Sequence, residues 1–519
     1  MKELIAHRTL LPVFESYAEK VAFHDGDWHG TYAEHAYRTL SVADAMTREL
    51  GVEKGDRFAI MAGNSHQYLE LYHAAFLTGA IANPLNLRLA GRELQFILAD
   101  SQTEVVFVDA MFAEHFSRAI AEVRQDLPIR KIVLIGDGDV PHDLEYEDLV
   151  ESGHPKVPPE PEETDPVILM YTGGTTGLPK GVLLDSRAEQ LNVYHIGCVL
   201  GVGDWRVYLH QTPMFHAASM AAVLGIPGTG ATSVFIPLFE PAEVMRLIES
   251  YEVNWTTMVP TMIAMVMNHP EFRPERLAPL SDLVYGASPM PEALLARVQA
   301  TFPDIKLSQG YGMTECSSVL TMLTCRDHQR GGPILRSAGK AVPGVSIRIE
   351  DEHGKVLGRD GNGEICARGG NFMSRYWNRP VETEAAFRDG WYHTGDEGHI
   401  DGDGYVYVVD RVKDMIVSGG ENVYSSEVEN AISTHPAVAQ VAVIGIPHDT
   451  LVEQVHAIVV LYPGAIATEE QIKGHVRESL AGYKVPKSVE FRSEPLPLSG
   501  ALKPLKRELR RPYWAKIDA

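Results

Sequence analysis

The chain has 519 residues, of which 45% are hydrophobic and 22% charged, a composition typical of a soluble globular protein with two to four structural units. Its formal net charge of −23 argues against a nucleic-acid partner and against electrostatic docking on anionic lipid, since both are themselves negative. The four cysteines are scattered without a CxxC pair or metal-ligand spacing, which predicts free thiols in a reducing cytoplasm. We expect no signal peptide, because residues 1–7 lack an apolar core, and no transmembrane segment, because glycine and proline interrupt the most apolar region, roughly residues 217–239.

The first part of the chain, up to residue 165, alternates short apolar runs with helical patterns. The apolar runs at residues 58–61, 105–108 and 132–135 predict buried strands, and the pattern at residues 67–77 predicts a helix. This alternation is typical of a doubly wound α/β sheet. A segment rich in proline and acidic residues, 155–165, predicts an exposed connection.

A second α/β stretch continues to about residue 330, with helices predicted at residues 186–200 and 241–251. Residues 337–409 then show short strands separated by glycine turns, which predicts a β-rich subdomain, a distorted barrel. The remaining residues predict a small α+β module with strands near 441–444 and 457–460. We therefore expect an N-terminal domain over residues 1–410 and a C-terminal domain over residues 411–519.

A stretch of glycines and threonines follows the predicted strand at residues 167–170. Its glycines allow the backbone N–H groups to turn toward one anion, and Lys180 adds a mobile point charge suited to phosphate oxygens. The stretch is not a P-loop, because Pro179 precedes the lysine and Gly181 follows it. It predicts a polyphosphate site formed by Thr172, Gly173, Gly174, Thr175, Thr176, Gly177 and Lys180.

Three later motifs offer groups for the rest of a nucleotide. Small residues at 285–288 let a flat base or an acyl chain lie against backbone, and in residues 309–315 a tyrosine between glycines can stack on adenine. Glu315 is a hard oxygen ligand suited to Mg²⁺, and Asp396 on a glycine turn suits ribose hydroxyls. The nucleotide-binding candidates are Ala287, Ser288, Gly310, Tyr311, Gly312, Thr314 and Asp396.

The order of these motifs resembles that of the adenylate-forming superfamily, which holds acyl-CoA synthetases, peptide-synthetase adenylation domains and beetle luciferases. The signature loop of the superfamily usually has Ser or Thr where this chain has Gly173. Residues 410–414 resemble its hinge, which implies that Arg411 meets the ribose or the α-phosphate and that Lys413 is the pivot. Residues 418–422 resemble the loop that lines the pantetheine tunnel, which implies CoA contacts from Gly419 and Gly420.

The resemblance also implies the catalytic residues. His216, in the motif at residues 212–216, falls at the gate between the carboxylate pocket and the thiol tunnel. The C-terminal motif at residues 500–510 puts the catalytic lysine on Lys503, flanked by Leu502 and Pro504 where the family has glycine and an aliphatic residue. Lys506 is the competing assignment. The implied catalytic set is Lys503, Glu315 and His216, with Glu315 as the metal ligand.

The implied activity is that of an ATP-dependent acid–CoA ligase of fatty acid metabolism, which forms an acyl-AMP and transfers the acyl group to CoA. ATP, Mg²⁺ and CoA are the implied co-substrates and cofactor, and the C-terminal domain is implied to be mobile. Small or apolar residues near the pocket favour a hydrophobic acid, medium- or long-chain fatty acids first and aryl or alicyclic acids second. They are Met214, Ala217, Gly286, Met313 and Cys316.

Three rival functions share these motifs. A carrier protein instead of CoA could accept the acyl group, and a luciferase-like oxygenase would differ only by its oxygen consumption. A non-catalytic nucleotide- or acyl-binding regulator is the most distant alternative. A homodimer is compatible with the sequence, and we expect the protein in the cytoplasm.

Overall fold

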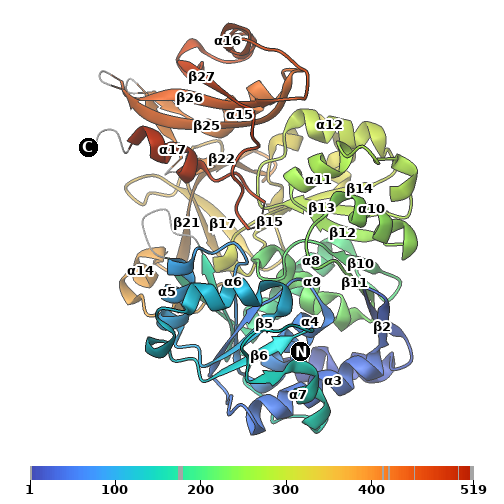
Figure 1. Cartoon of the computed structure of the whole chain (residues 1–519). Helices are drawn as coiled ribbons and strands as arrows, with labels where there is room; N and C mark the ends of the chain where they lie inside the picture. Colours follow the sequence, from blue (N-terminus) through green and yellow to red (C-terminus); the bar gives the residue numbers. More distant parts are fainter. Residues whose placement is uncertain are drawn as a thin grey trace.

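The computed structural model describes residues 3–172, 179–411, 414–418, 421–448, 451–500 and 502–514, without the side chains of Arg411, Glu421, Asn422 and Val452. Figure 1 shows a large unit formed by most of the chain and a smaller C-terminal unit above it. Among the described residues, no helix is both long enough and apolar enough to cross a membrane.

An eight-stranded sheet, mostly parallel, forms the first α/β layer. Its alternate residues face opposite sides: Phe58 and Ile60 pack with helices α3, α4 and α7, whereas Ala59 and Met61 pack with α5 and α6. The strands in order are β19 (Arg375–Tyr376), β9 (Lys180–Asp185), β8 (Pro166–Thr172), β4 (Ile81–Pro84), β3 (Arg57–Met61), β5 (Val105–Asp109), β6 (Lys131–Ile135) and β7 (Leu144–Glu145). The helices are α3 (Tyr32–Arg48), α4 (His66–Thr78), α5 (Gly91–Ser101), α6 (Ala110–Ile120) and α7 (Tyr146–Ser152), and two short helices, α1 (Ala6–Thr9) and α2 (Leu11–Ser16), precede them.

A nine-stranded sheet forms the second α/β layer, and its two faces are likewise covered by different helices. Leu209 and Leu283 pack with α10, α11 and α12, whereas Tyr208 and Trp255 pack with α8 and α9. The strands in order are β16 (Lys340–Ala341), β15 (Thr321–Leu323), β14 (Lys306–Tyr311), β13 (Asp282–Gly286), β12 (Trp255–Met258), β10 (Val207–His210), β11 (Thr232–Phe235), β1 (Val21–Asp25) and β2 (Trp28–Thr31). The helices are α8 (Ser186–Leu200), α9 (Met220–Gly225), α10 (Pro241–Ser250), α11 (Pro260–Met267), α12 (Glu292–Thr301) and α13 (Cys325–Arg330).

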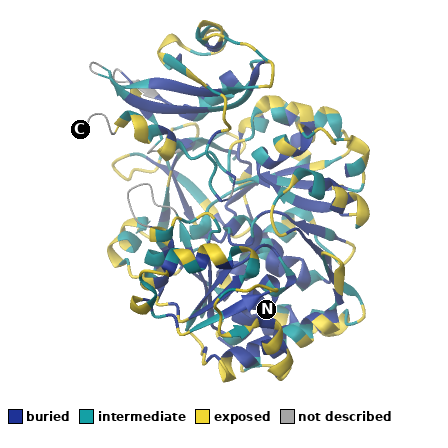
Figure 2. Cartoon of the chain, in the orientation of Figure 1, coloured by how far each residue is buried: buried dark blue, intermediate teal, exposed yellow. Residues whose placement is uncertain are grey.

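Two smaller sheets complete the chain. The β-rich part holds β17 (Ser346–Glu350), β18 (Gly363–Arg368), β20 (Phe387–Arg388), β21 (Trp391–Ile400) and β22 (Val406–Arg411), with the helix α14 (Pro380–Ala386). The C-terminal sheet holds β23 (Ile416–Ser418), β24 (Glu421–Val423), β25 (Val438–His448), β26 (Val452–Leu461) and β27 (Ser488–Arg492). Its helices are α15 (Ser425–Ser433), α16 (Glu469–Arg477) and α17 (Lys506–Trp514). Figure 2 shows that the strands of the large sheets are largely buried, whereas the outer faces of the surrounding helices are exposed.

The predicted fold class is confirmed: the chain forms two α/β layers, a β-rich subdomain and a small α+β unit, although β1 and β2 near the N-terminus belong to the second layer and β19 to the first. The predicted strands correspond to β3, β5, β6 and β8, and the helix predicted at residues 186–200 is α8. The segment at residues 155–165 is a connection without helix or strand.

Candidate active site

A cavity of about 3240 Å³ lies between the large unit and the C-terminal unit, and the segment that follows β27 forms part of its lining. Most of the predicted site residues that the structure describes line it, although they come from segments far apart in the sequence. They are Thr172, His216, Ala217, Gly286, Ala287, Ser288, Gly310, Tyr311, Gly312, Met313, Thr314, Glu315, Asp396 and Lys503. The fold therefore brings Thr172, which precedes the glycine-rich stretch, to the same cavity as the predicted adenine, ribose and lysine residues.

Tyr311 and Asp396, predicted for adenine and ribose, are directly connected. The Tyr311 hydroxyl at the end of β14 donates a hydrogen bond of 2.7 Å to Asp396 Oδ2 on β21. Burial, and then the negative charge of Asp396, raises the pKa of Tyr311 well above its usual value, so the phenol stays protonated and can donate. On the neighbouring strand β22, the backbone of Arg411 pairs opposite Asp396, which brings the second predicted ribose residue to the same edge.

Close backbone approach explains two of the glycines. Gly286 pairs opposite Gly310 across β13 and β14, and a Cβ on Gly286 would lie 2.3 Å from the Gly310 carbonyl oxygen. A Cβ on Gly312 would lie 2.0 Å from the Ser318 carbonyl oxygen. Neither position tolerates a side chain, so both glycines are required by the close approach of neighbouring backbone beside the cavity.

Glu315, the predicted Mg²⁺ ligand, lies on the short helical turn Thr314–Cys316 after β14. Its Oε1 accepts a hydrogen bond of 2.8 Å from the Tyr376 hydroxyl, and Lys180 Nζ lies 5.2 Å from the centre of the Tyr376 ring. Thr172 and Lys180 pair opposite each other on β8 and β9, on either side of the glycine-rich stretch. The Glu315 carboxylate and the Lys180 ammonium therefore both contact Tyr376. A carboxylate suits Mg²⁺, and an ammonium suits phosphate oxygens.

His216 follows a loop that the large unit holds from several sides. The Asn64 side chain forms two of these contacts: its Nδ2 donates to the Thr212 carbonyl at 3.1 Å, and its Oδ1 accepts from the backbone N–H of Met214 at 2.8 Å. The Tyr72 hydroxyl donates to the Met214 carbonyl at 2.7 Å. Burial, with the positive charge of Lys503 added to it, lowers the pKa of His216 to about 3. The imidazole is therefore neutral at physiological pH.

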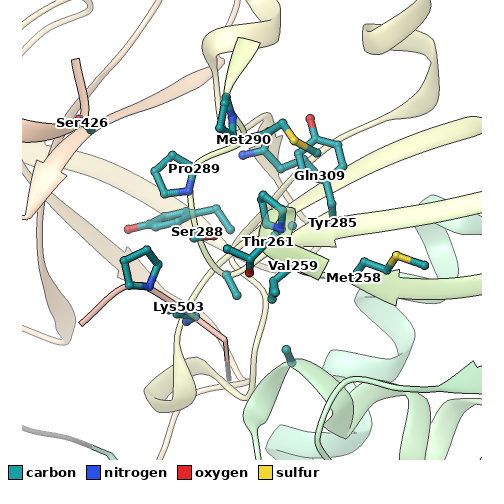
Figure 3. A pocket seen from close by; sticks show the side chains of 18 of the residues that line it. Met258, Val259, Thr261, Tyr285, Ser288, Pro289, Met290, Gln309, Ser426 and Lys503 are labelled. Atoms are coloured by element: carbon teal, nitrogen blue, oxygen red, sulfur yellow. The ribbon is translucent and has the colours of Figure 1, made fainter. Parts of the chain in front are cut away.

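Lys503 lies on a hairpin whose two sides are residues 497–499 and 503–505. Leu498 and Pro504 form a β-bridge, and the backbone N–H of Ser499 donates to the Lys503 carbonyl at 2.7 Å. Lys503 on this C-terminal segment lines the cavity together with Thr261 and Ser288 of the large unit (Figure 3).

Lys506, the competing assignment, is engaged within the C-terminal unit. Its Nζ donates to Ser425 Oγ at 2.7 Å and lies 2.7 Å from Glu429 Oε1. Although burial acts in the opposite direction, the negative charges of Glu429 and Asp410 raise the pKa of Lys506. Lys503 and Lys506 both line the cavity, and these contacts hold the Lys506 ammonium against Ser425 and Glu429.

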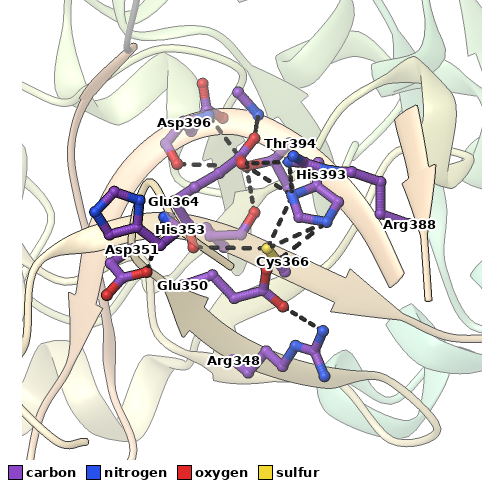
Figure 4. Close-up of polar contacts among 12 residues, drawn as sticks. Arg348, Glu350, Asp351, His353, Glu364, Cys366, Arg388, His393, Thr394 and Asp396 are labelled. Carbon is purple, nitrogen blue, oxygen red and sulfur yellow. Dashed lines mark hydrogen bonds and ion pairs between the residues drawn. The ribbon is translucent and has the colours of Figure 1, made fainter. Parts of the chain in front are cut away.

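A polar cluster supports the turn that carries Asp396 (Figure 4). His393 Nδ1 lies 2.8 Å from Glu364 Oε2, and the backbone N–H of Gly395 donates to Glu364 Oε1 at 3.1 Å. Cys366 Sγ lies 3.3 Å from His393 Nδ1, and burial raises the pKa of this thiol to about 12. Three side chains of this cluster have possible metal-ligand atoms within 4.8 Å of one another: Glu350, Cys366 and His393. However, both carboxylates of the cluster already form ion pairs with arginine, Glu350 with Arg348 and Glu364 with Arg388. We interpret the cluster as support for the Asp396 turn.

Several predicted residues lie elsewhere. Met214 and Cys316, predicted for the acyl pocket, are fully buried and are not among the residues that line the cavity; burial raises the pKa of the Cys316 thiol to about 12. Lys180 is also outside the lining, against Tyr376. Gly173, Gly174, Thr175, Thr176, Gly177, Lys413, Gly419 and Gly420 fall outside the described residues, as does the side chain of Arg411.

Sequence reasoning missed an apolar part of the lining, formed by α8 and α9 on one side and by β10, β12 and β13 on the other. The helix α8 was predicted, but no pattern told which of its side chains face a cavity rather than the core. These lining residues are Val193, Ile196, Leu200, Tyr208, Ala221, Ala222, Gly225, Trp255 and Val284, with Val202 just after α8. Thr261 and Ser426, also in the lining, were missed as well.

Comparison with known proteins identifies the family. The AMP-binding enzyme family matches residues 13–377, and the AMP-binding enzyme C-terminal domain family matches residues 427–503. A feruloyl-CoA synthase of an Amycolatopsis species is 36% identical over 484 residues, which cover 93% of this chain and 94% of that protein. A long-chain-fatty-acid–CoA ligase of Mycobacterium tuberculosis is 35% identical over 513 residues, which cover 98% of this chain and 97% of that protein.

Among solved structures, the o-succinylbenzoate CoA synthetase of Bacillus subtilis, in complex with its acyl-adenylate intermediate, is 28% identical. The match covers 96% of this chain and 97% of that chain with a TM-score of 0.82. Together with the motifs gathered around one cavity, these likenesses show that the chain belongs to the AMP-binding enzyme family of the adenylate-forming superfamily.

Proposed function

We propose that the protein is an ATP-dependent acid–CoA ligase that activates a hydrophobic acid, a medium- or long-chain fatty acid first and an aryl or alicyclic acid second. The observation that carries this proposal is the place of Lys503. A lysine from the C-terminal segment lines the same cavity as Tyr311, Asp396 and Glu315, and its charge acts on His216. This supports a role for Lys503 as the cation between the carboxylate and the α-phosphate.

In the first half-reaction, the substrate carboxylate attacks the α-phosphorus of ATP, forming the acyl–phosphate bond of acyl-AMP and releasing pyrophosphate. The two reacting groups are anions, so their approach must be stabilised by positive charge. Lys503 would lie between them, while Tyr311 and Asp396 hold the adenosine and Lys180 approaches the leaving pyrophosphate. Glu315 would hold Mg²⁺, which neutralises phosphate charge when bound.

In the second half-reaction, the CoA thiolate attacks the acyl carbonyl carbon, forming the thioester and releasing AMP. A thiol with a pKa of about 8.5 is already a few per cent ionised near neutral pH, so no dedicated base is required. The same resemblance that implies the hinge leads us to propose a domain boundary between residues 410 and 411, a pivot at Lys413 and CoA contacts from Gly419 and Gly420. Rotation of the C-terminal domain would withdraw Lys503 before the thiol enters.

The apolar lining supports a hydrophobic acid. The lining residues contributed by α8, α9, β10, β12 and β13 include no charged group, and α9 contributes only alanine and glycine to them. Small residues along one wall leave room for a long apolar chain, which favours a fatty acid. The 36% sequence identity to a feruloyl-CoA synthase favours an aryl acid as the second candidate.

The proposal is tested by pyrophosphate release with ATP and Mg²⁺ across acetate, octanoate, palmitate, benzoate and ferulate, each with and without CoA. We expect release that depends on a hydrophobic acid and thioester that accumulates only with CoA. Release without thioester would point to a carrier protein as the acceptor, and acid-dependent oxygen consumption to an oxygenase. Binding of ATP without release on any acid would contradict the proposal. A cytoplasmic location and a homodimer stay predictions, to be checked by fractionation and by light scattering.

A further inference from the structure

We propose that Leu502 is a positioning residue, whose side chain anchors the Lys503 hairpin in the large unit and so favours the first half-reaction over the second. This inference rests on the proposed role of Lys503. It concerns a residue that does not itself touch the reacting atoms but fixes the backbone of the one that does.

The side chain of Leu502 is buried in a cluster that belongs to the large unit. Only 8% of Leu502 is exposed, and the other buried residues of its cluster all lie between Leu209 and Leu307, among them Met258, Val259 and Met262. Leu502 therefore joins the C-terminal segment to the apolar interior of the other domain. Burial of a leucine is a strong, non-directional attraction, so it stabilises whichever domain arrangement buries it.

The backbone conformation of Leu502 indicates that this burial overcomes a local cost. Its φ is +58°, in the left-handed region that favours glycine because a Cβ crowds the following carbonyl. A leucine keeps such a conformation only when surrounding contacts fix it. Glycine would relieve the strain but could not enter the cluster.

Lys503 cannot move independently of Leu502, because the hairpin is closed on itself and attached to the large unit. The backbone N–H of Lys503 donates to Ser499 Oγ at 3.1 Å, and the backbone N–H of Leu502 donates to the Ser499 carbonyl at 2.9 Å. Thr261 Oγ1 donates to the Leu502 carbonyl at 2.6 Å, and Arg88 Nη1 donates to the Leu498 carbonyl at 3.3 Å.

The tip of the hairpin also fits closely against the large unit, since a Cβ on Gly500 would lie 2.1 Å from Asn86 Oδ1. Any rotation that withdraws Lys503 must therefore pull Leu502 out of its cluster. It follows that the burial of Leu502 raises the population of the arrangement with Lys503 in the cavity, and that this same burial must be lost before CoA attack.

The test measures the two half-reactions separately in the full-length protein. Single-turnover pyrophosphate release without CoA reports adenylation, and CoA consumption from supplied acyl-AMP reports thioester formation. We expect Leu502→Ala to slow adenylation about tenfold or more and to leave thioester formation unchanged or faster, with ATP affinity within about twofold of wild type. Leu502→Gly should slow adenylation as well, because it also lacks the buried side chain.

Leu280→Ala is the matched control, since Leu280 is 7% exposed in the same cluster but lies wholly within the large unit. We expect it to lower the melting temperature without changing the ratio of the two rates. Equal loss of both rates in Leu502→Ala, or wild-type adenylation in Leu502→Gly, would overturn the inference. Absence of pyrophosphate release from the wild-type protein, or an unaffected Lys503→Ala variant, would instead overturn the proposed function on which it rests.

Discussion

The Tyr311 hydroxyl donates a hydrogen bond of 2.7 Å to Asp396, so the residue proposed to stack on adenine also orients the residue proposed to bind ribose. Tyr311→Phe would keep the ring and remove only this donor. Because a hydrogen bond to a charged group contributes about 1.5–3 kcal/mol, we expect the KM for ATP to rise about tenfold or more. The KM for the acid should stay within about twofold.

Initial rates at varied ATP and varied acid would check this prediction, and Tyr407→Phe would be a control in the same part of the structure. An unchanged KM for ATP in Tyr311→Phe would show that Asp396 is held by its own turn, through Glu364 and Thr394, rather than by the tyrosine.

Substitution of the two lysines of the C-terminal motif should have different effects on activity and on stability. We expect Lys503→Ala to reduce adenylation by a factor on the order of 10² to 10³, because it removes a cation from between two reacting anions, with thioester formation from supplied acyl-AMP retained. Lys506→Ala should instead lower the melting temperature, because it leaves Glu429 and Asp410 without their buried cation. Half-reaction rates and thermal unfolding of both variants would separate the roles, and the opposite pattern would reassign the catalytic lysine to Lys506.

His216 should not contribute an inflection to the pH dependence of adenylation near neutrality. Its pKa is lowered to about 3, so the imidazole is neutral throughout the range from pH 5.5 to 8.5. Replacement by an aromatic ring without titratable nitrogens, His216→Phe, should therefore change the rate by a factor that is constant over this range. The ratio of wild-type to variant rates, measured at half-unit pH steps, checks this; a ratio that changes near pH 6.5 would show that the imidazole titrates there.

Local patterns predicted the elements well because each strand and helix carries its own periodicity. The strands β3, β5 and β6 and the helix α8 follow from apolar runs and helical spacing in a few adjacent residues. The same is true of the turns that carry Tyr311 and Asp396, whose glycines are visible in the sequence. These features could be predicted because they depend on residues that are adjacent in the sequence.

What the sequence did not reveal depends on contacts between distant segments. Tyr311 and Asp396 are separated by 85 positions, and the cluster that buries Leu502 lies in another domain. Cys366 belongs to no sequence motif, yet adjacent strands bring its sulfur beside His393. Cys316 was predicted to line the acyl pocket, but the turn after β14 points it into the core. Orientation of this kind is set by packing and not by residue type.

Acyl-chain length should depend on the small residues of α9. Ala222 lines the cavity and packs in one cluster with Tyr208 and Trp255, so a larger side chain at this position would project into the apolar space. We expect Ala222→Phe to lower kcat/KM for palmitate about tenfold or more relative to octanoate, because the longer chain alone would meet the new ring. Rates for acids of increasing length, with benzoate as the short internal control, check this. A uniform loss over all acids would place the acyl chain elsewhere.

Glu189 on α8 should make the protein less stable as the pH rises. Its side chain is fully buried, and burial raises the pKa of this carboxyl to about 8, from a usual value near 4.5. Between these two values the unfolded chain has lost the proton that the folded chain still holds. The free energy of unfolding therefore falls as the pH rises through this interval, by at most about 1.4 kcal/mol per pH unit and by a few kcal/mol in total.

Glu189→Gln removes the titration while keeping the shape of the side chain, so the variant should gain stability relative to wild type progressively from pH 5 to pH 8. Thermal unfolding at several pH values checks this, with the exposed Glu151→Gln as the control that should run parallel to wild type. If the curves of Glu189→Gln and wild type were parallel as well, the carboxyl would already be ionised in the folded protein. It would then need a hydrogen-bonding or cationic partner that offsets its burial.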